Sequence, residues 1–525
     1  MDSAQRARSF LLAAGTLTLA VATLAPTNSP PSPAATGPAP APAARPNVVV
    51  IMADDMRADD MRWMPATRRL IRQHGARFTN SFSPYPLCCP ARASFLNGQY
   101  THNHDVWSTR RPYGFRSFKD RRTLPVWLRS AGYNTLFVGK YLNKYGIQPT
   151  RGGKPSVRYV PPGWTDWRAS IDGGLPRTHP RAGGTYRYYD MTLNVNGALR
   201  GNQGRYSTGV VGRQSVRLIR RYADRDRPFF LWSSYVAPHH GAPREPDDPL
   251  PVRRNDGKWT RITTPAVTDG VRNRFNKQIR RPAGLPTEKD VSDKPEFIER
   301  PRINKRERRA MLEAARQRAE SVWLVDRQVA DTIAALRAAG ELRSTLVIFT
   351  SDNGYFQGEH QQRQGKTTPY EPALRTPLLI RGPGIPKGVT RKSPFLTIDF
   401  APTILAAAKA RMPSSIDGRP RLDIAQSGGE GWRRPVLTET LYVPKSNARG
   451  PEDWISSAGV RTPGFFYTEH STGEAELYDM RRDPAQRRNV AGRDGYAGER
   501  ARLERMLDDL RECAGDTCGR PLSDW

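Results

Sequence analysis

The sequence predicts an α/β fold: a large, mostly parallel sheet flanked by helices, with a smaller C-terminal α+β subdomain. Short apolar runs without polar alternation are typical of strands buried on both faces, as in parallel sheets. Helical patterns separate these runs, and this alternation is typical of α/β domains. Near residue 435 the pattern changes to three short strand-like pieces, PVLTETLYV, GFFYTEH and AELYDM, followed by one helix. This change indicates the smaller subdomain.

The expected elements follow one another along the chain. Glycines follow the first two expected helices and favour their termination there. We expect strands at residues 47–52, 134–139, 228–236, 345–350 and 376–382. We expect helices at residues 65–75, 123–132, 207–224 and 305–339, with 397–410 continuing the pattern and 499–513 closing the chain.

The longest expected helix, at 305–339, has an apolar stripe at helical spacing. The stripe consists of Met311, Ala315, Ala319, Val322, Val329, Ile333 and Leu336. On the same helix we expect Trp323 to pack and Asp326 to cap or pair locally.

The first 25 residues have the pattern of a secretory signal peptide. Arg6 and Arg8 precede an apolar run from Phe10 to Leu24, which is short for a spanning helix. A single N-terminal membrane anchor is the alternative. The expected location is secreted or extracytoplasmic.

Composition divides the rest of the chain. Residues 26–45 are a Pro/Ala-rich linker that cannot build a core. We expect the main α/β domain at 46–434 and the smaller subdomain at 435–525. Within the main domain, 241–305 is rich in Pro, Arg and Lys and poor in periodicity, which predicts a long basic surface insertion.

The chain is strongly basic, with 83 Lys and Arg against 51 Asp and Glu and a formal net charge of +32. Such a field attracts anionic partners, and nucleic acid, sulfated or phosphorylated sugars and anionic envelope polymers all fit. There is no zinc-finger pattern, RNP-type motif or basic helix before a heptad zipper, so we do not expect nucleic acid as a partner.

The chain has four cysteines. Cys513 and Cys518 are candidates for a small disulfide, which an exported protein can keep. Cys88 and Cys89 are adjacent, and adjacent cysteines rarely bridge each other. The first pair therefore needs another explanation.

Oxygen-bearing side chains follow two of the expected strands. Asp54 and Asp55 follow the first, and Asp352 and Asn353 follow the strand at 345–350. In open α/β sheets, ligands bind at the carboxyl ends of strands. Oxygen ligands favour Ca²⁺ or Mg²⁺ over zinc. The alternative is two ordinary turns in which these side chains cap the next helix.

A short helix is expected directly after Cys88. Pro90 suits its first turn and Gly98 its end. Cys88 then lies at a helix N-terminus, where the dipole and free N–H groups favour bound anions. Arg92 adds a planar cation that fits a tetrahedral oxyanion. The alternative is a buried cysteine pair beside a surface arginine.

The run Cys88-Cys89-Pro90-Ala91-Arg92 resembles the sulfatase signature Cys-x-Pro-Ser/Ala-Arg. The wider segment CCPARASFLNGQYTHNHDVW is similar to N-acetylglucosamine-6-sulfatases and extracellular heparan sulfatases. The resemblance implies an alkaline-phosphatase-like fold. It also implies that a separate formylglycine-generating enzyme oxidises Cys88, and not Cys89, to formylglycine. Ala91 stands where the family more often has Ser, and we still expect the modification.

The resemblance extends to the expected metal site. Asp54, Asp55, Asp352 and Asn353 fall where the family places its Ca²⁺ ligands, together with the oxidised side chain of Cys88. Ca²⁺ is expected rather than Mg²⁺.

Three further segments are similar to the family and imply site residues. GKYLNKY implies a sulfate contact by Lys140, and GKTTPYEPALRTPLLIRGPGI implies that Lys366 holds the sulfate. APHHG implies His239, with His240 as a weaker rival. Leu142 stands where many arylsulfatases have His, so no catalytic His is assigned there.

The mechanism implied by the resemblance is hydrolysis of a sulfate ester. One hydroxyl of the hydrated aldehyde, activated by the metal and Asp352, attacks sulfur. The alcohol leaves, protonated by His239, and the second hydroxyl then expels sulfate. The metal, Arg92, Lys140 and Lys366 neutralise the sulfate.

The resemblance favours a sulfated sugar as substrate, such as N-acetylglucosamine-6-sulfate or a glycosaminoglycan. The alternatives are a broad arylsulfatase, a phosphonate or phosphate ester hydrolase, and a non-catalytic binder of anionic polysaccharide. The basic insertion is either a solvated surface or a rim that recruits polyanions. His104 either borders the sulfate or fixes a loop, and His360 lies near the site or is structural.

Overall fold

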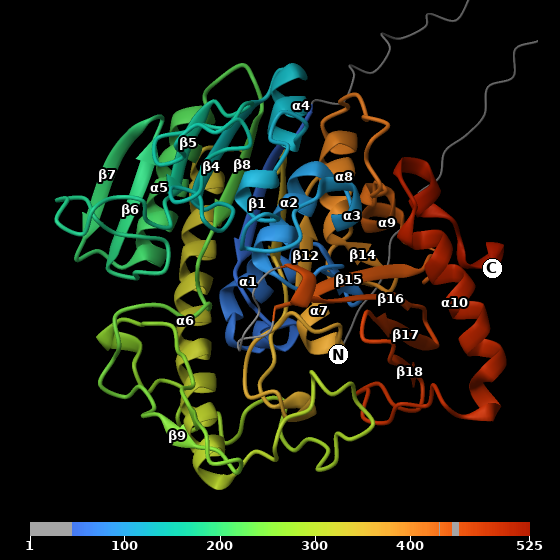
Figure 1. Ribbon diagram of the computed structural model, residues 1–525. Coiled ribbons are helices and arrows are strands. Elements are labelled where there is room, and N and C mark those ends of the chain that lie inside the picture. The colour runs from blue at the N-terminus through green and yellow to red at the C-terminus, as the bar shows by residue number, and fades with distance from the viewer. Residues whose placement is uncertain (1–44, 430, 444–450) are drawn as a thin grey trace, which may run out of the picture. The chain divides into compact units, whose positions relative to one another are not determined.

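A ten-stranded sheet forms the centre of the fold, with the strand order β13-β2-β12-β11-β1-β8-β4-β5-β6-β7 (Figure 1). The computed structural model describes residues 45–429, 431–443 and 451–525. The predicted signal peptide, and the predicted linker apart from Arg45, lie outside the described residues. Among the residues described, no helix combines the length and apolar character needed to cross a membrane.

Four neighbouring parallel strands form the middle of the sheet. They are β11 (Thr345–Ser351), β1 (Asn47–Ala53), β8 (Phe229–Ser234) and β4 (Asn134–Lys140). All four were predicted from their apolar runs, and nearly every residue in them is buried. Because they are parallel, their carboxyl ends meet at one edge of the sheet.

The flanking strands make the sheet mixed. β12 (Leu378–Arg381) is antiparallel to β11, and β5 (Asp166–Ser170) is parallel to β4. β6 (Asp190–Val195) and β7 (Ala198–Gln203) form an antiparallel hairpin. The other margin consists of β2 (Ala76–Phe78) and β13 (Val389–Arg391). The predicted sheet was therefore right in its centre and lacked β2, β13 and β5 to β7.

Helices cover both faces of the sheet. Val48, Val50 and Met52 of β1 face α2 (Cys88–Asn97), α4 (Leu124–Ser130) and α8 (Phe400–Ala407) in one apolar core. Val49 and Ile51 face α5 (Ser207–Tyr222) and α6 (Lys305–Ala338) in a second core. The alternation of β1 between two cores explains its uninterrupted apolar sequence.

The long helix α6 confirms the predicted stripe, since all seven of its residues are buried. Asn304 caps the helix through the backbone N–H groups of Arg306 and Glu307. Asp326 caps a helix, but the helix is not its own. Its carboxylate accepts hydrogen bonds from the backbone N–H groups of Ala66 and Thr67 at 2.9 and 2.6 Å, and so caps another helix, α1 (Pro65–Leu70).

The helix expected at 65–75 is shorter in the structure. α1 ends at Leu70, and a 3₁₀ turn at Arg72–His74 follows. Gly75 then passes β12 closely, because a Cβ atom on this residue would lie 2.2 Å from the carbonyl oxygen of Ile380. The chain turns there to pass β12, which a local sequence pattern does not reveal.

The C-terminal region is a four-stranded antiparallel sheet with one helix. Its strands are β15 (Val436–Tyr442), β16 (Ile455–Arg461), β17 (Phe465–His470) and β18 (Ala475–Asp479). α10 (Ala497–Arg511) buries Leu503, Met506, Leu507 and Leu510 in the core that it shares with this sheet. The α+β character predicted for this region is confirmed, although β16 was not among the expected strands.

Residues 241–305 contain little regular structure. Two strands of two residues each, β9 (Val252–Arg253) and β10 (Trp259–Thr260), pair with each other. Phe275 and Ile279 pack with residues of α6. The segment is therefore held against α6 by apolar contacts.

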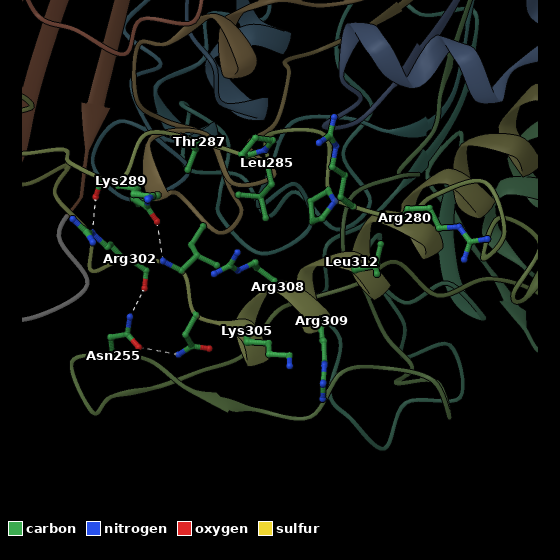
Figure 2. Close-up of a pocket in the computed structure, with 16 residues that line it drawn as sticks. Asn255, Arg280, Leu285, Thr287, Lys289, Arg302, Lys305, Arg308, Arg309 and Leu312 are labelled. Atoms are coloured by element: carbon green, nitrogen blue, oxygen red, sulfur yellow. Dashed lines mark hydrogen bonds between the residues drawn. The ribbon is translucent and has the colours of Figure 1, made fainter.

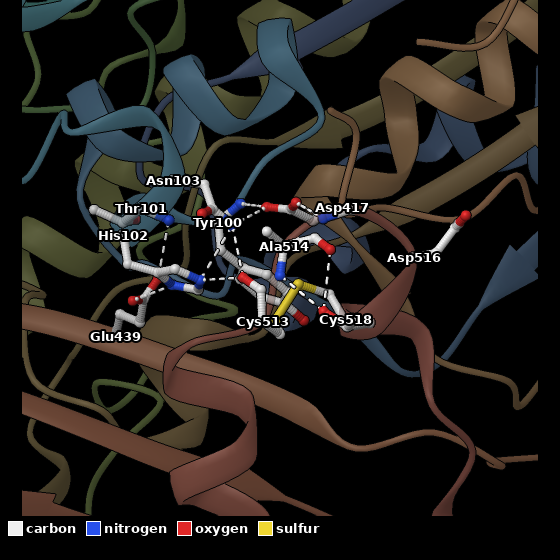
Figure 3. Close-up of a disulfide and its surroundings, with 12 residues drawn as sticks. Tyr100, Thr101, His102, Asn103, Asp417, Glu439, Cys513, Ala514, Asp516 and Cys518 are labelled. Carbon is white, nitrogen blue, oxygen red and sulfur yellow. Dashed lines mark hydrogen bonds and ion pairs between the residues drawn. A yellow bond between two sulfur atoms is a disulfide. The ribbon is translucent and has the colours of Figure 1, made fainter. Parts of the chain in front are cut away.

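The predicted disulfide between Cys513 and Cys518 is present (Figure 3). It lies beside the segment that follows α2. The Asp417 carboxylate accepts hydrogen bonds from the backbone N–H groups of both Tyr100 and Gly515, at 2.7 Å each. The carbonyl of Cys513 accepts one from the Asn103 side chain at 2.9 Å. These contacts join the end of the chain to the segment behind α2.

Candidate active site

Polar side chains converge at the carboxyl edge of the four parallel strands. Asp54 directly follows β1 and Asp352 directly follows β11, while Lys140 ends β4 and Ser234 ends β8. All four side chains are buried. This is the edge where open α/β sheets bind their ligands.

Cys88 reaches this edge from the first residue of α2. The helix ends at Gly98, which has a φ of +69° and so adopts the left-handed conformation typical of a helix C-terminus. The Sγ atom of Cys88 lies 3.2 Å from Asp54 Oδ1 and 2.9 Å from the Nζ atom of Lys366. Cys88 is 1% exposed, so its thiol is enclosed by charged groups.

Three carboxylates and the thiol form a compact cluster. Asp54, Asp55, Cys88 and Asp352 each place one donor atom within 4.8 Å of the others. Asn353 donates its side-chain N–H to Asp55 Oδ1 at 2.7 Å. The Asn353 Oδ1 atom is buried and has no hydrogen-bond partner among the described residues.

The cluster fits a hard divalent cation. Its carboxylates, together with the unpartnered amide oxygen of Asn353, supply the oxygen ligands that Ca²⁺ and Mg²⁺ prefer. The predicted metal ligands Asp54, Asp55, Cys88, Asp352 and Asn353 thus all lie in one place.

Two lysines and one arginine balance the three carboxylates. Lys140 pairs with Asp54, and Lys366 pairs with Asp55. Burial alone would raise the pKa of the Asp55 carboxyl, but the positive charge of Lys366 holds that pKa well below its usual range. The lysines therefore keep a buried negative charge in place.

Arg92 is the third cation and is fully buried. Its Nε atom donates to Asp352 at 2.8 Å, and Nη1 donates to the Lys140 carbonyl at 2.8 Å and to the Ser234 hydroxyl at 2.7 Å. Its Nη2 atom has no partner among the residues described. One N–H group of a rigid guanidinium is thus left for a ligand.

His239, and not its neighbour His240, faces the cluster. Its Nε2 atom lies 3.7 Å from Asp55 Oδ2, and its Nδ1 atom lies 2.7 Å from the His240 carbonyl. The ring also contacts that of Tyr186, with 4.7 Å between centroids. Burial lowers the pKa of His239 well below its ordinary value.

The thiol of Cys88 is chemically quiet in this setting. Burial raises the pKa of Cys88 well above its ordinary value, and the negative charge of Asp54 raises it further. A thiol that keeps its proton is a poor nucleophile. This setting therefore disfavours the thiolate form of Cys88.

Two other histidines that the sequence singled out are structural. His104 is buried, and its ring nitrogens lie 3.0 Å from Ser94 Oγ and 3.1 Å from the Val106 backbone nitrogen. His360 lies 2.5 Å from Glu288 Oε1. Both fix loops and neither belongs to the cluster.

Sequence reasoning missed Ser234, Tyr186 and Arg318 as neighbours of the site. Arg318 donates to the Asp55 carbonyl at 2.5 Å and to the Pro238 carbonyl at 3.2 Å. It falls on the apolar side of α6, and a cation in an otherwise apolar stripe was a usable signal. Tyr186 comes from a loop with no local signature.

Comparison with known proteins agrees with this geometry. A family model described as sulfatase matches residues 46–410, and one described as the C-terminal part of N-sulphoglucosamine sulphohydrolase matches residues 358–513. An arylsulfatase of Chlamydomonas reinhardtii is 31% identical, over 91% of this chain and 76% of the relative. An N-acetylglucosamine-6-sulfatase of Capra hircus is 30% identical, over 91% and 85%.

A solved structure of a protein in complex with its substrate D-glucosamine-2-N,6-O-disulfate shares the fold. Its TM-score is 0.68 at 22% identity, covering 89% of this chain and 98% of that one. The predicted alkaline-phosphatase-like fold is thereby confirmed. Because the sulfatase family model matches well over half of the sequence, the chain belongs to the sulfatase family and is a sulfuric ester hydrolase.

Proposed function

We propose that this protein removes sulfate from a sulfated sugar, such as N-acetylglucosamine-6-sulfate or a glycosaminoglycan residue, with an oxidised Cys88 and Ca²⁺. The observation that carries the proposal is the cluster of Cys88, three carboxylates and three cations at the carboxyl edge of the sheet. The choice of sugar rests on the N-acetylglucosamine-6-sulfatases among the relatives.

Oxidation of Cys88 to formylglycine gives the site a nucleophile that a thiol cannot replace. When hydrated, the aldehyde supplies one hydroxyl that attacks sulfur and a second that later expels sulfate. A sulfur-linked sulfate has no second hydroxyl with which to do this. The raised pKa of the Cys88 thiol also makes the unmodified side chain a poor nucleophile.

The cation would be held by Asp54, Asp55, Asp352 and Asn353, with the oxidised residue 88 as a further ligand. When bound, it would polarise the sulfate and the attacking hydroxyl. The larger and more flexible coordination of Ca²⁺ suits several carboxylates in one cluster, whereas Mg²⁺ usually keeps several waters.

The three cations would hold the sulfate. Lys366 already contacts the Sγ atom of Cys88 at 2.9 Å, next to the position where the transferred group would lie. The free Nη2 N–H of Arg92 can donate to a sulfate oxygen. Lys140, fixed by Asp54, completes the positive side of the site. Fixed charges of this kind stabilise charge that develops during reaction.

His239 is the proposed general acid for the departing alcohol. Its Nδ1 atom is held by the His240 carbonyl, so Nε2 is the nitrogen that faces the cluster. Burial opposes protonation of this ring and the negative charge of Asp55 favours it. When protonated, His239 would deliver a proton from Nε2 to the ester oxygen, so that the sugar leaves as a neutral alcohol.

Export is part of the proposal. It rests on the sequence pattern of residues 1–25, and the Cys513–Cys518 disulfide suits an oxidising compartment. We further propose residues 46–434 as the catalytic domain and 435–525 as the smaller subdomain. The N-terminal sequence of protein recovered from culture medium would test the cleavage.

The decisive experiment combines mass and turnover on one sample. The chain is co-expressed with a formylglycine-generating enzyme, and the mass of the Cys88 peptide is compared with turnover of 4-nitrocatechol sulfate with and without Ca²⁺. We expect sulfur replaced by oxygen with loss of two hydrogens, and turnover that tracks this fraction and Ca²⁺. Modified protein without sulfate-ester turnover, or with faster turnover of a phosphonate monoester, would overturn the proposal.

A further inference from the structure

A groove of about 880 Å³ lies between the 280–289 segment, Arg302 and the beginning of α6 (Figure 2). Figure 2 shows its side chains coming from loop segments and from the first turns of the helix. Seven of its lining residues are cations: Arg280, Arg281, Lys289, Arg302, Lys305, Arg308 and Arg309. All seven are exposed, and none of the described residues that line the groove is acidic.

These cations are unpaired, in contrast to many arginines elsewhere. Within the described part of the chain, none of the seven forms an ion pair with a carboxylate. Arg302 donates only to a backbone carbonyl, that of Lys289, at 3.0 Å. The groove therefore presents its positive charge to solvent.

Local helix stability does not explain this arrangement. Arg308 and Arg309 follow Lys305 by three and four residues in the first turns of α6. Like charges at these spacings repel each other, and cations near the N-terminus oppose the helix dipole. Glu307 does not offset them, because its carboxylate is buried and accepts hydrogen bonds from Arg363 at 2.7 and 3.2 Å. An anionic ligand would relieve the repulsion.

The groove is joined to the active site through two connections. Gln361 lines the groove and accepts a hydrogen bond from the Ile303 backbone N–H at 2.8 Å. It belongs to the segment that runs from Asn353 to Lys366, both of which lie in the site.

The second connection is α6. Arg308 lines the groove, and Arg318 of the same helix donates to the Asp55 carbonyl. The rise of about 1.5 Å per residue places the two positions roughly 15 Å apart along the helix axis. A chain of several sugar residues can span such a distance, whereas a single sugar cannot.

We infer that this groove binds a sulfated polysaccharide chain, the continuation of the substrate whose terminal or internal sulfate lies at Cys88. The inference rests on the proposed function and extends it from a sulfated sugar to a polyanionic chain. Guanidinium groups match sulfate oxygens in pairs. The lining residues include no aromatic side chain on which bases could stack, which favours polysaccharide over single-stranded nucleic acid.

The test compares two triple variants of the full-length chain. Lys305→Gln/Arg308→Gln/Arg309→Gln removes three cations from the groove. Arg213→Gln/Arg217→Gln/Arg220→Gln removes three exposed cations from α5, outside the groove, and is the matched control. Affinity for size-defined heparin oligosaccharides is measured at several salt concentrations, and turnover of 4-nitrocatechol sulfate is measured in parallel.

We expect the groove variant to bind heparin at least about tenfold more weakly at low salt, with a salt slope lower by about one for each cation removed. Its turnover of the small ester should equal that of wild type. Equal heparin binding by both variants would overturn the inference, as would single-stranded DNA that competes through the groove with higher affinity than heparin. Absence of turnover in the wild type would instead count against the proposed function, because heparin binding does not require it.

Discussion

The active site and the basic groove both contain lysine and arginine side chains, but these side chains are paired in the site and unpaired in the groove. In the site, Lys140, Lys366 and Arg92 are each paired with one of three buried carboxylates. In the groove, none of the seven exposed cations forms an ion pair with a carboxylate of the described residues. Pairing fixes the geometry of side chains, whereas unpaired exposed charge attracts anions over a distance but fixes little. The comparison indicates a division between chemistry and recruitment.

The largest expected effect concerns the centre of the site. Cys88→Ala removes the precursor of the nucleophile, and turnover of 4-nitrocatechol sulfate should fall to background, a loss on the order of a millionfold by analogy with other covalent enzymes. Cys89→Ala, next to it in α2, should keep turnover because its thiol lies in the apolar core. Equal activity of the two variants would remove Cys88 from the mechanism.

The second prediction compares the loss of unfolding free energy when a paired or an unpaired cation is replaced. Arg92→Gln leaves Asp352 buried without its cation and should reduce the free energy of unfolding by about 3–5 kcal/mol. Arg308→Gln, in the groove, should leave unfolding unchanged because the side chain is exposed and unpaired. Urea denaturation of both variants checks this. Similar denaturation midpoints would contradict the proposed difference between paired and unpaired cations.

A third experiment asks whether the carboxylates of the site hold a cation. At a hundredfold excess over its Kd, Ca²⁺ should stabilise the folded chain by about 2.7 kcal/mol. Asp54→Asn/Asp55→Asn should abolish the Ca²⁺-dependent rise in Tm, whereas Asp508→Asn on the exposed side of α10 should not. A rise that persists in the double variant would place the ion elsewhere.

The smallest expected effect is the pH dependence of the stability that His102 gains from its pairing with Glu439, outside the active site. Burial alone would lower the pKa of His102, but its hydrogen bond to Glu439 and the charge of that carboxylate raise the pKa to about 9. The stabilisation is complete below the unfolded pKa of about 6.5 and is lost as the pH rises through about 9.

The difference in unfolding free energy between wild type and His102→Gln should therefore shrink by on the order of 2 kcal/mol between pH 6 and pH 10. Glu439→Gln provides the control, since a His102 without its carboxylate partner should show little of this dependence. If the difference in unfolding free energy stayed constant between pH 6 and pH 10, the charge of His102 would not stabilise the fold.

Sequence reasoning worked best where burial on both sides dictated the residues. β1, β4, β8 and β11 had uninterrupted apolar runs because each faces two cores. β7 and β16 escaped prediction because their exposed or polar positions interrupt the pattern. The end of α1 at Leu70, before the predicted stop at Gly75, was also missed.

The candidate site could be located from motifs at strand ends and from the family resemblance. All predicted site residues lie together, because parallel strands bring their carboxyl ends to one edge. The neighbours Tyr186 and Ser234 were missed because single polar residues in a loop and at a strand end carry no spacing signal. The sequence predicted a basic, aperiodic insertion, but only the structure revealed that its residues form a groove.

The contacts behind α2 also set an order in time. The segment Tyr100–Asn103 is bound by Asp417 and by the carbonyl of Cys513 (Figure 3). During synthesis Cys513 is added 410 residues after Asn103, so this contact forms late. The helix that begins with Cys88 therefore lacks its final support for most of translation. Under the proposed function, that interval would let a modifying enzyme reach Cys88, whose side chain is buried in the folded protein.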